Sequence, residues 1–92
     1  MIKSIKHKGL KRLFEKGDTS KLPPAQITRI EDILSSLNVA TTKEDMNAPG
    51  SGFHELKGNL KGFYAVRVTG NYRIVFRIES GSVFDVDYLD YH

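Results

Sequence analysis

Residues 63–89 contain three segments in which apolar and polar side chains alternate, and this alternation constrains the fold more than any other feature. The segments are FYAVRVT (63–69), NYRIVFRIE (71–79) and SVFDVDYL (82–89). A period of two is typical of a strand with one buried and one exposed face. Gly70-Asn71 and Ser80-Gly81 lie at the joints, where tight hairpin turns need positive φ. The pattern predicts an antiparallel meander of three consecutive strands.

The alternation also assigns a face to each strand residue. The predicted apolar face carries Tyr64, Val66, Val68, Tyr72, Ile74, Phe76, Ile78, Phe84, Val86 and Tyr88. The predicted polar face carries Arg67, Thr69, Arg73, Arg77, Glu79, Asp85 and Asp87. Helices can cover the apolar face of such a sheet and leave the polar face for binding.

Two helices are predicted upstream of the meander, after a short strand at residues 2–5. In the first, from residue 8 to residue 16, apolar residues share one face at spacings of three and four: Leu10, Leu13 and Phe14. Gly17 is suited to end it in a left-handed conformation. Pro23-Pro24 opens the second, where a missing N–H costs nothing. Its apolar stripe is Ile27, Ile30, Ile33, Leu34 and Leu37. One more turn is expected at 41–46, followed by a loop at NAPGSG (47–52).

A chain of 92 residues with 39% hydrophobic content predicts one domain, residues 1–92. Its expected class is α+β, with two N-terminal helices packed on a twisted antiparallel sheet. No apolar run approaches the ~20 residues of a membrane span, and the basic start lacks the apolar block of a secretory signal. The absence of cysteine favours the reducing cytoplasm. Without cysteine, and with only three scattered histidines, a structural zinc site is not expected.

Positive charge is concentrated at the start of the chain. Residues 1–21 hold seven of the 14 Lys and Arg residues but only two of the 11 Asp and Glu residues. Such a block indicates either an anionic partner, meaning nucleic acid or an acidic protein, or a solvated helix face.

Two short segments contain residues with the potential for acid–base chemistry. HELKG (54–58) places His54 and Lys57 three residues apart, and the chain closes on LDYH (89–92). Hairpin register predicts that Asp90, Tyr91 and His92 emerge at the same end of the sheet as Arg73. We expect His54 and Lys57 to join them because the first and third strands of a meander run parallel. The alternative is that all of these are ordinary surface residues.

Cleavage of RNA through its own 2′-OH suits this set of side chains. The reaction needs a base for the 2′ proton, an acid for the 5′ oxygen, and cations for the charge on phosphorus. Histidine supplies base or acid near neutral pH, and Arg73 and Lys57 supply cations. Tyr91 would stack on a base or donate a proton, and Asp90 would orient a histidine. The residues leave open which histidine is base and which is acid.

The segments MIKSIKHKGLKRLFEKG, HELKGNLKGFYAVRV, GNYRIVFRI and YLDYH together resemble the HigB toxins of the RelE/ParE superfamily. The resemblance covers nearly the whole chain, although Tyr72 stands where related sequences often have tryptophan. It implies a toxin that cuts mRNA in the ribosomal A site without a metal ion or other cofactor. It also implies a helix-turn-helix antitoxin of the HigA type, through which alone the toxin reaches operator DNA.

Residue by residue, the resemblance implies a catalytic set of His54, Lys57, Arg73, Asp90, Tyr91 and His92. Contacts with ribosomal RNA are expected from Lys6, Lys8, Lys11, Arg12, Lys16, Arg67 and Arg77. Two alternatives remain: a ParE-like inhibitor of DNA gyrase without chemistry, and an inactive member that binds only its antitoxin and operator. A gyrase inhibitor would not need His54, Lys57 and His92 together.

Overall fold

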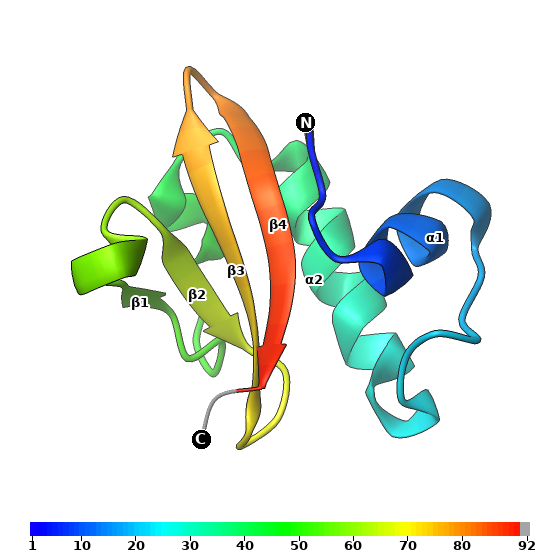
Figure 1. Cartoon of the computed structure of the whole chain (residues 1–92). Helices are drawn as coiled ribbons and strands as arrows, with labels where there is room; N and C mark the ends of the chain where they lie inside the picture. The colour runs from blue at the N-terminus through cyan, green and yellow to red at the C-terminus, as the bar shows by residue number, and fades with distance from the viewer. Residues whose placement is uncertain (91–92) are drawn as a thin grey trace.

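The protein, described over residues 1–90 by a computed structural model, combines two α-helices with a four-stranded antiparallel sheet (Figure 1). The strands follow chain order across the sheet: β1 (His54–Glu55), β2 (Tyr64–Arg67), β3 (Tyr72–Glu79) and β4 (Ser82–Asp90). This confirms the α+β class and the meander. The sheet nevertheless has one strand more than predicted, because the HELKG segment begins with β1.

Both helices begin and end close to where the sequence predicts. The first, α1 (Lys8–Lys16), starts at His7, whose Nδ1 accepts a hydrogen bond from Leu10 N (3.2 Å). It ends at Gly17 with φ 68°, a left-handed conformation that glycine adopts without strain. A 3₁₀ turn (Pro24–Gln26) leads into α2 (Ile27–Val39). A second 3₁₀ turn (Lys43–Met46) lies where one more turn was expected.

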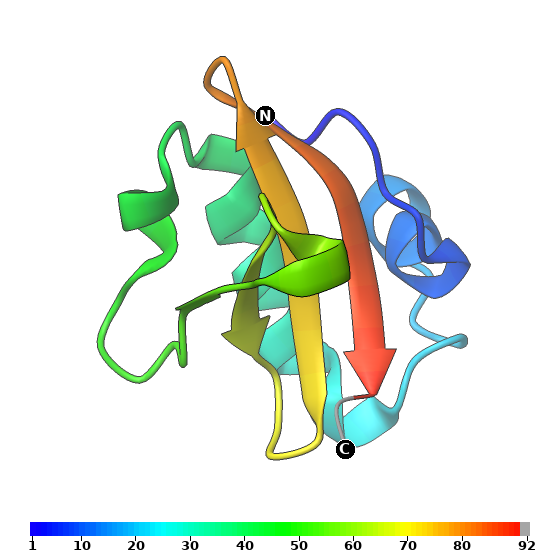
Figure 2. The same ribbon diagram turned by 60° about the vertical axis from the view of Figure 1, so that its left-hand side comes forward.

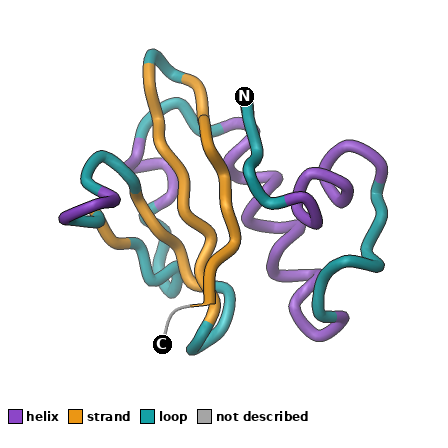
Figure 3. Tube along the Cα trace, in the orientation of Figure 1, coloured by secondary structure: helices purple, strands orange, loops and turns teal. Residues whose placement is uncertain are grey.

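The helices bury their apolar stripes against one face of the sheet. The main core residues are Leu10, Leu13, Ile30, Ile33, Leu34, Leu37, Val66, Ile74, Phe76, Val83 and Val86. Figure 3 shows α1 and α2 together on the β4 side of the molecule. Phe14 was assigned to the buried stripe, and this is wrong, because its side chain is 38% exposed. None of the helices in residues 1–90 is long and apolar enough to cross a bilayer.

The first residues of the chain run along the free edge of β4. Ile2 forms a parallel bridge with Val83, and Ile5 forms one with Val86. The amides of Lys3 and Lys6 donate to the carbonyls of Val83 and Val86, each at 2.7 Å. The predicted strand at 2–5 is therefore present as two isolated bridges. Its hydrogen bonds satisfy an edge that would otherwise remain open to other chains.

A cluster of aromatic rings connects the C-terminal end of β4 to the starts of both helices. Tyr88 stacks on Tyr72 with ring centroids 5.0 Å apart, and the His7 ring meets Tyr88 edge-on at 5.3 Å. The Tyr88 hydroxyl donates to the side chain of Gln26. Burial raises the pKa of Tyr88, so its hydroxyl remains a neutral donor. These contacts hold β4 in place at the end where the chain terminus follows.

A β-bulge in β4 changes which side chains face the core. Arg77 pairs with Phe84 but Val75 pairs with Asp87, so β4 carries an extra residue between these pairs. Val83 and Val86 are both fully buried, three residues apart. Phe84 was assigned to the apolar face, and this is wrong. It lies instead beside Arg77, whose Cζ is 5.1 Å from its ring centroid.

Polar contacts hold the bulge at Asp85, a non-glycine residue with φ 55°. The Asp85 carboxylate accepts from Arg77 Nε (2.8 Å), and its amide donates to Ser4 Oγ (2.8 Å). The hydrogen bond from Arg77 lowers the pKa of Asp85. Aspartate tolerates the left-handed region better than most residues, and these partners offset the remaining strain.

The two hairpin turns differ in kind. Ser80 and Gly81 have φ of 52° and 77°, as predicted for a tight two-residue turn. The prediction for Gly70-Asn71 is wrong, because neither residue has a positive φ. There the Thr69 hydroxyl accepts from the amides of Asn71 and Tyr72, each at 3.2 Å. A side-chain hydrogen bond therefore stabilises this longer turn.

The bulge can be tested by placing the same carboxylate at neighbouring positions. Val83→Asp should lower the free energy of unfolding by more than about 3 kcal/mol, because the charge would be buried among apolar groups. Phe84→Asp should lower it by less than about 1 kcal/mol, because this side chain is partly solvated beside Arg77. Urea unfolding followed by circular dichroism measures both. A larger loss for Phe84→Asp would contradict the bulge.

Candidate active site

The outer strand β1 brings the HELKG segment onto the sheet. His54 pairs with Ala65 of β2, which pairs with Val75 of β3, which in turn pairs with Asp87 of β4. The first and third strands of the meander, β2 and β4, run parallel as expected, but this alone does not bring the HELKG segment to the end of β4. Residues that directly precede β2 lie toward the opposite end of the sheet from Asp90, and the antiparallel pairing of β1 returns His54 toward it.

The segment between β1 and β2 lies over the sheet face that the helices leave uncovered. In Figure 2 the 3₁₀ turn Gly58–Leu60 is on the viewer's side of the sheet and α2 is behind it. Ala65 and Val75 face away from the helices, yet both are buried. The polar face is therefore shielded at its centre, and two pockets adjoin the turn.

Three of the predicted site residues line a single pocket. His54, Lys57 and Arg73 surround it, together with Glu55, Leu56 and Ala65. His54 and Lys57 are exposed and Arg73 is partly buried. Of the six residues expected to converge, the pocket contains these three. They come from β1, from the residue before the 3₁₀ turn, and from the central strand β3.

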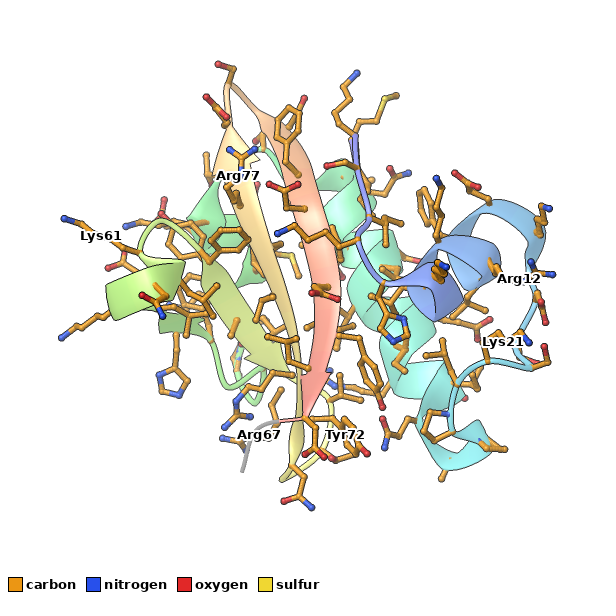
Figure 4. The ribbon with its side chains drawn as sticks, viewed as in Figure 1. Arg12, Lys21, Lys61, Arg67, Tyr72 and Arg77 are labelled. Carbon is orange, nitrogen blue, oxygen red and sulfur yellow. The ribbon has the colours of Figure 1, made fainter. Side chains whose placement is uncertain are left out.

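Like charges face each other beside this pocket. Arg67, the last residue of β2, is the direct cross-strand partner of Arg73. Cross-strand pairs of like charge destabilise a sheet, and a bound anion would relieve the repulsion. Figure 4 shows Arg67 near the end of β4, whereas Arg77 lies toward the other end of the sheet. The pair adds positive charge where His54 and Lys57 already lie.

Glu55 and Lys43 belong to the site surroundings, and neither was predicted from the sequence. Lys43 Nζ lies 2.6 Å from Glu55 Oε1 and 5.7 Å from the centroid of the Tyr64 ring. The hydrogen bond lowers the pKa of Glu55 and raises that of Lys43. Glu55 therefore remains ionised, and its principal partner is Lys43, with a smaller attraction to Lys57. No spacing in the sequence signals this pair.

The loop before β1 holds Arg67 in place. The Ser51 carbonyl accepts from Arg67 N (2.8 Å), and Arg29 of α2 donates to the Arg67 carbonyl through Nε (3.2 Å) and Nη2 (3.0 Å). Gly52 has φ +65°, and a Cβ there would lie 3.0 Å from Arg67 Cβ. Only glycine fits this close approach. Arg29 and Gly52 are thus positioning residues that no pattern in the sequence singles out.

The end of β4 lies beside Arg73, as hairpin register predicts. Tyr72 pairs with Asp90, and Arg73 pairs with Leu89. Asp90 is therefore at the same end of the sheet as Arg67 and Arg73. Tyr91 and His92 lie outside the described residues, so their assignment to the site remains a prediction.

The residues expected to contact RNA are spread over two surfaces. Lys8, Lys11, Arg12 and Lys16 belong to α1, and Figure 4 shows Arg12 across the molecule from Lys61. Arg12 Nε forms an ion pair with Asp18 (2.8 Å), which lowers the pKa of that carboxyl. Arg77 pairs with both Asp85 and Glu79. The positive charge of Arg12 and of Arg77 is therefore partly neutralised within the chain.

The arrangement fits an anion such as a phosphodiester better than a cation. The pocket combines an imidazole, an ammonium and a guanidinium, which bind and stabilise negative charge on phosphate oxygens. Among residues 1–90, no group of three or more His, Asp or Glu side chains is placed to hold a metal ion.

Comparison with known proteins shows which family the chain matches. The model of a family described as the RelE-like toxin of the type II toxin–antitoxin system HigB matches residues 3–92. Endoribonuclease HigB of Proteus vulgaris is 44% identical, and the match covers all of both chains. Toxin HigB-1 of Vibrio cholerae serotype O1 is 33% identical, over all of this chain and 98% of that protein.

Solved structures with much lower sequence identity share the fold. The YoeB–YefM complex of Staphylococcus aureus contains a chain that matches with a TM-score of 0.63 and 16% identity, over 100% of this chain and 98% of that one. The YoeB/ParE toxin of Agrobacterium tumefaciens matches with a TM-score of 0.59 and 17% identity, over 100% and 99%.

Two glycines of the loop before β1 provide a matched test of the close approach to Arg67. Gly50→Ala should lower the free energy of unfolding by about 1 kcal/mol, because alanine is strained at φ +80° but meets no atom. Gly52→Ala should cost about 1–3 kcal/mol more, because the methyl group also displaces Arg67. Urea unfolding measures the difference. Equal losses would mean that the contact with Arg67 is unimportant.

Proposed function

The chain belongs to the HigB family of RelE-like toxins of type II toxin–antitoxin systems, and we propose that it is an endoribonuclease that cleaves mRNA by metal-free attack of the RNA 2′-OH. One observation carries the proposal: His54, Lys57 and Arg73 line the same pocket. An imidazole that can act as base or acid and two cations are among the groups that this reaction requires.

Each step of the cleavage can be assigned to residues of the proposed site. A base takes the 2′ proton, the 2′ oxygen bonds to phosphorus, and the bond from phosphorus to the 5′ oxygen breaks. An acid protonates that departing oxygen, leaving a 2′,3′-cyclic phosphate and a 5′-hydroxyl. His54 and His92 are the candidates for base and acid. Arg73 and Lys57 stabilise the charge on phosphorus, Tyr91 stacks on a base or donates a proton, and Asp90 orients a histidine.

The proposed substrate is mRNA in the A site of the 70S ribosome. The exposed lysines of α1 support a ribosomal RNA contact, because phosphate binding relies on accessible cations. Arg67, the cross-strand partner of Arg73, would add a cation beside the pocket. Lys6, Arg12 and Arg77 complete the proposed set, with smaller contributions from the two arginines because they already have carboxylate partners.

An antitoxin is the second proposed partner. A type II system pairs each toxin with a protein inhibitor, and the structural neighbours include a YoeB–YefM toxin–antitoxin complex. For this chain we propose a HigA-type helix-turn-helix antitoxin that carries the operator contact, so that the toxin reaches DNA only through it. Because ribosomes and such antitoxins are cytoplasmic, the proposed location of the protein is the cytoplasm.

The gyrase-inhibitor alternative is not favoured. The family match is to HigB, and the relative with 44% identity carries the name endoribonuclease. A binding module without chemistry would have no use for His54, Lys57 and Arg73 in one pocket. The alternative of an inactive member is also less consistent with these three residues.

Cleavage of a defined mRNA in a purified translation system tests the function, with cut sites mapped by primer extension. His54→Ala, Lys57→Gln and His92→Ala should each reduce the cleavage rate by about 10²- to 10⁴-fold, because each removes a proton-transfer or charge-stabilising group. Lys21→Gln is the matched control and should cleave normally, since Lys21 lies on the far side of the molecule (Figure 4).

Omitting ribosomes should abolish cleavage by the unmodified protein. Absence of cleavage by folded protein in the presence of ribosomes would contradict the proposal and direct the work to gyrase supercoiling assays.

Ribosome binding over a range of salt concentrations tests the role of α1. Replacing Lys8, Lys11 and Lys16 together by Gln should weaken binding and reduce the slope of log K against log salt by about 0.7–0.9 for each phosphate that the variant no longer binds. Arg12→Gln should change binding less than Lys11→Gln, because Arg12 is paired with Asp18. An unchanged slope for the triple variant would contradict the proposed surface.

A further inference from the structure

We propose that a second pocket, next to the candidate active site, binds a neighbouring nucleotide of the cleaved RNA strand. Phe63 would pack against the base and Lys61 would contact the phosphate. The proposal extends the endoribonuclease function and rests on it. It concerns the segment that joins β1 to β2, which the catalytic scheme does not use beyond Lys57.

The second pocket is continuous with the first. Both pockets are lined by Glu55, Leu56 and Lys57. Beyond these residues, the lining of the second pocket includes Lys61 and Phe63. Lys57 therefore lies on the boundary between the two. A strand whose scissile phosphate is bound near Lys57 would place an adjacent nucleotide in the second pocket.

A compact turn places two lysines on the same pocket. The amide of Lys61 donates to the Gly58 carbonyl (3.1 Å), and the amide of Phe63 donates to the Leu60 carbonyl (2.9 Å). Gly62, with φ +94°, has open space where a Cβ would project. Within residues 1–90, neither Lys57 nor Lys61 forms an ion pair. Both ammonium groups are available to phosphate oxygens, which bind lysine as a point charge.

Phe63 supplies an aromatic surface in the same pocket. Its side chain is partly exposed, and Lys6 Nζ lies 5.6 Å from its ring centroid. Proteins bind single-stranded RNA by stacking bases on aromatic rings within positively charged grooves. Among the described residues, Glu55 is the one carboxylate on this pocket, and it pairs with Lys43. An aromatic ring flanked by Lys6, Lys57 and Lys61 therefore fits a nucleotide better than an apolar or acidic peptide.

The test measures binding to ribosomes carrying an mRNA with 2′-O-methyl nucleotides in the A-site codon, which cannot be cleaved. Phe63→Leu should weaken binding by about 5- to 100-fold without changing the salt dependence, because the base stack is removed and the charge is unchanged. Lys61→Gln should weaken binding and reduce the salt slope by about 0.7. Lys21→Gln is the matched control and should change neither quantity.

Thermal unfolding and binding to ribosomes without mRNA distinguish the subsite from other causes of weaker binding. Thermal unfolding should be unchanged by Lys61→Gln, so that its effect on binding cannot come from misfolding. Binding of both variants like the unmodified protein would overturn the subsite. Equal losses on ribosomes without mRNA would also overturn it, because the contact would then be with ribosomal RNA. In the same system, the protein without substitutions must cleave mRNA that lacks 2′-O-methyl groups. Absence of this cleavage would refute the endoribonuclease function itself, independently of the subsite.

Discussion

The antiparallel pairing of β3 with β4 is the interaction on which the rest of the structure depends. Its register, from Tyr72 opposite Asp90 to Glu79 opposite Ser82, fixes the end of the chain beside Arg73. The bulge within it turns Val83 and Val86 toward the helices and leaves Asp85 for Arg77 and Ser4. A shift by one residue would exchange the two faces and remove both the core and the site.

The distribution of charge separates structural cations from those available for ligands. Arg12 and Arg77 are held by carboxylates, and Lys43 offsets Glu55. At the candidate site, Lys57 forms no ion pair within residues 1–90, and Arg67 faces Arg73 directly across the sheet. The backbone of Arg67 is held by the Ser51 carbonyl and by the Arg29 guanidinium. The candidate site thus places two arginines on neighbouring strands, close to His54 and Lys57.

Local patterns predicted most of the elements because each depends on near neighbours in the chain. The stripe of α2, the stop at Gly17 and the Ser80-Gly81 turn follow from the spacing and φ preferences of a few residues. The errors concern positions decided elsewhere. Phe84 was given the wrong face because the bulge depends on Ser4 and Arg77, and β1 was missed because two residues carry no periodic signal.

The sequence by itself determined the fold class, the faces of the helices and of β3, and the residue types available for RNA cleavage. These properties follow from hydrophobic periodicity and side-chain chemistry, which do not require knowledge of distant contacts. Only the tertiary structure decided that His54, Lys57 and Arg73 share a pocket, that Glu55 is offset by Lys43, and that a second pocket adjoins the first. These three features depend on the pairing of β1 with β2 and on the path of the segment that connects them across the sheet. Long-range packing determines that pairing and that path.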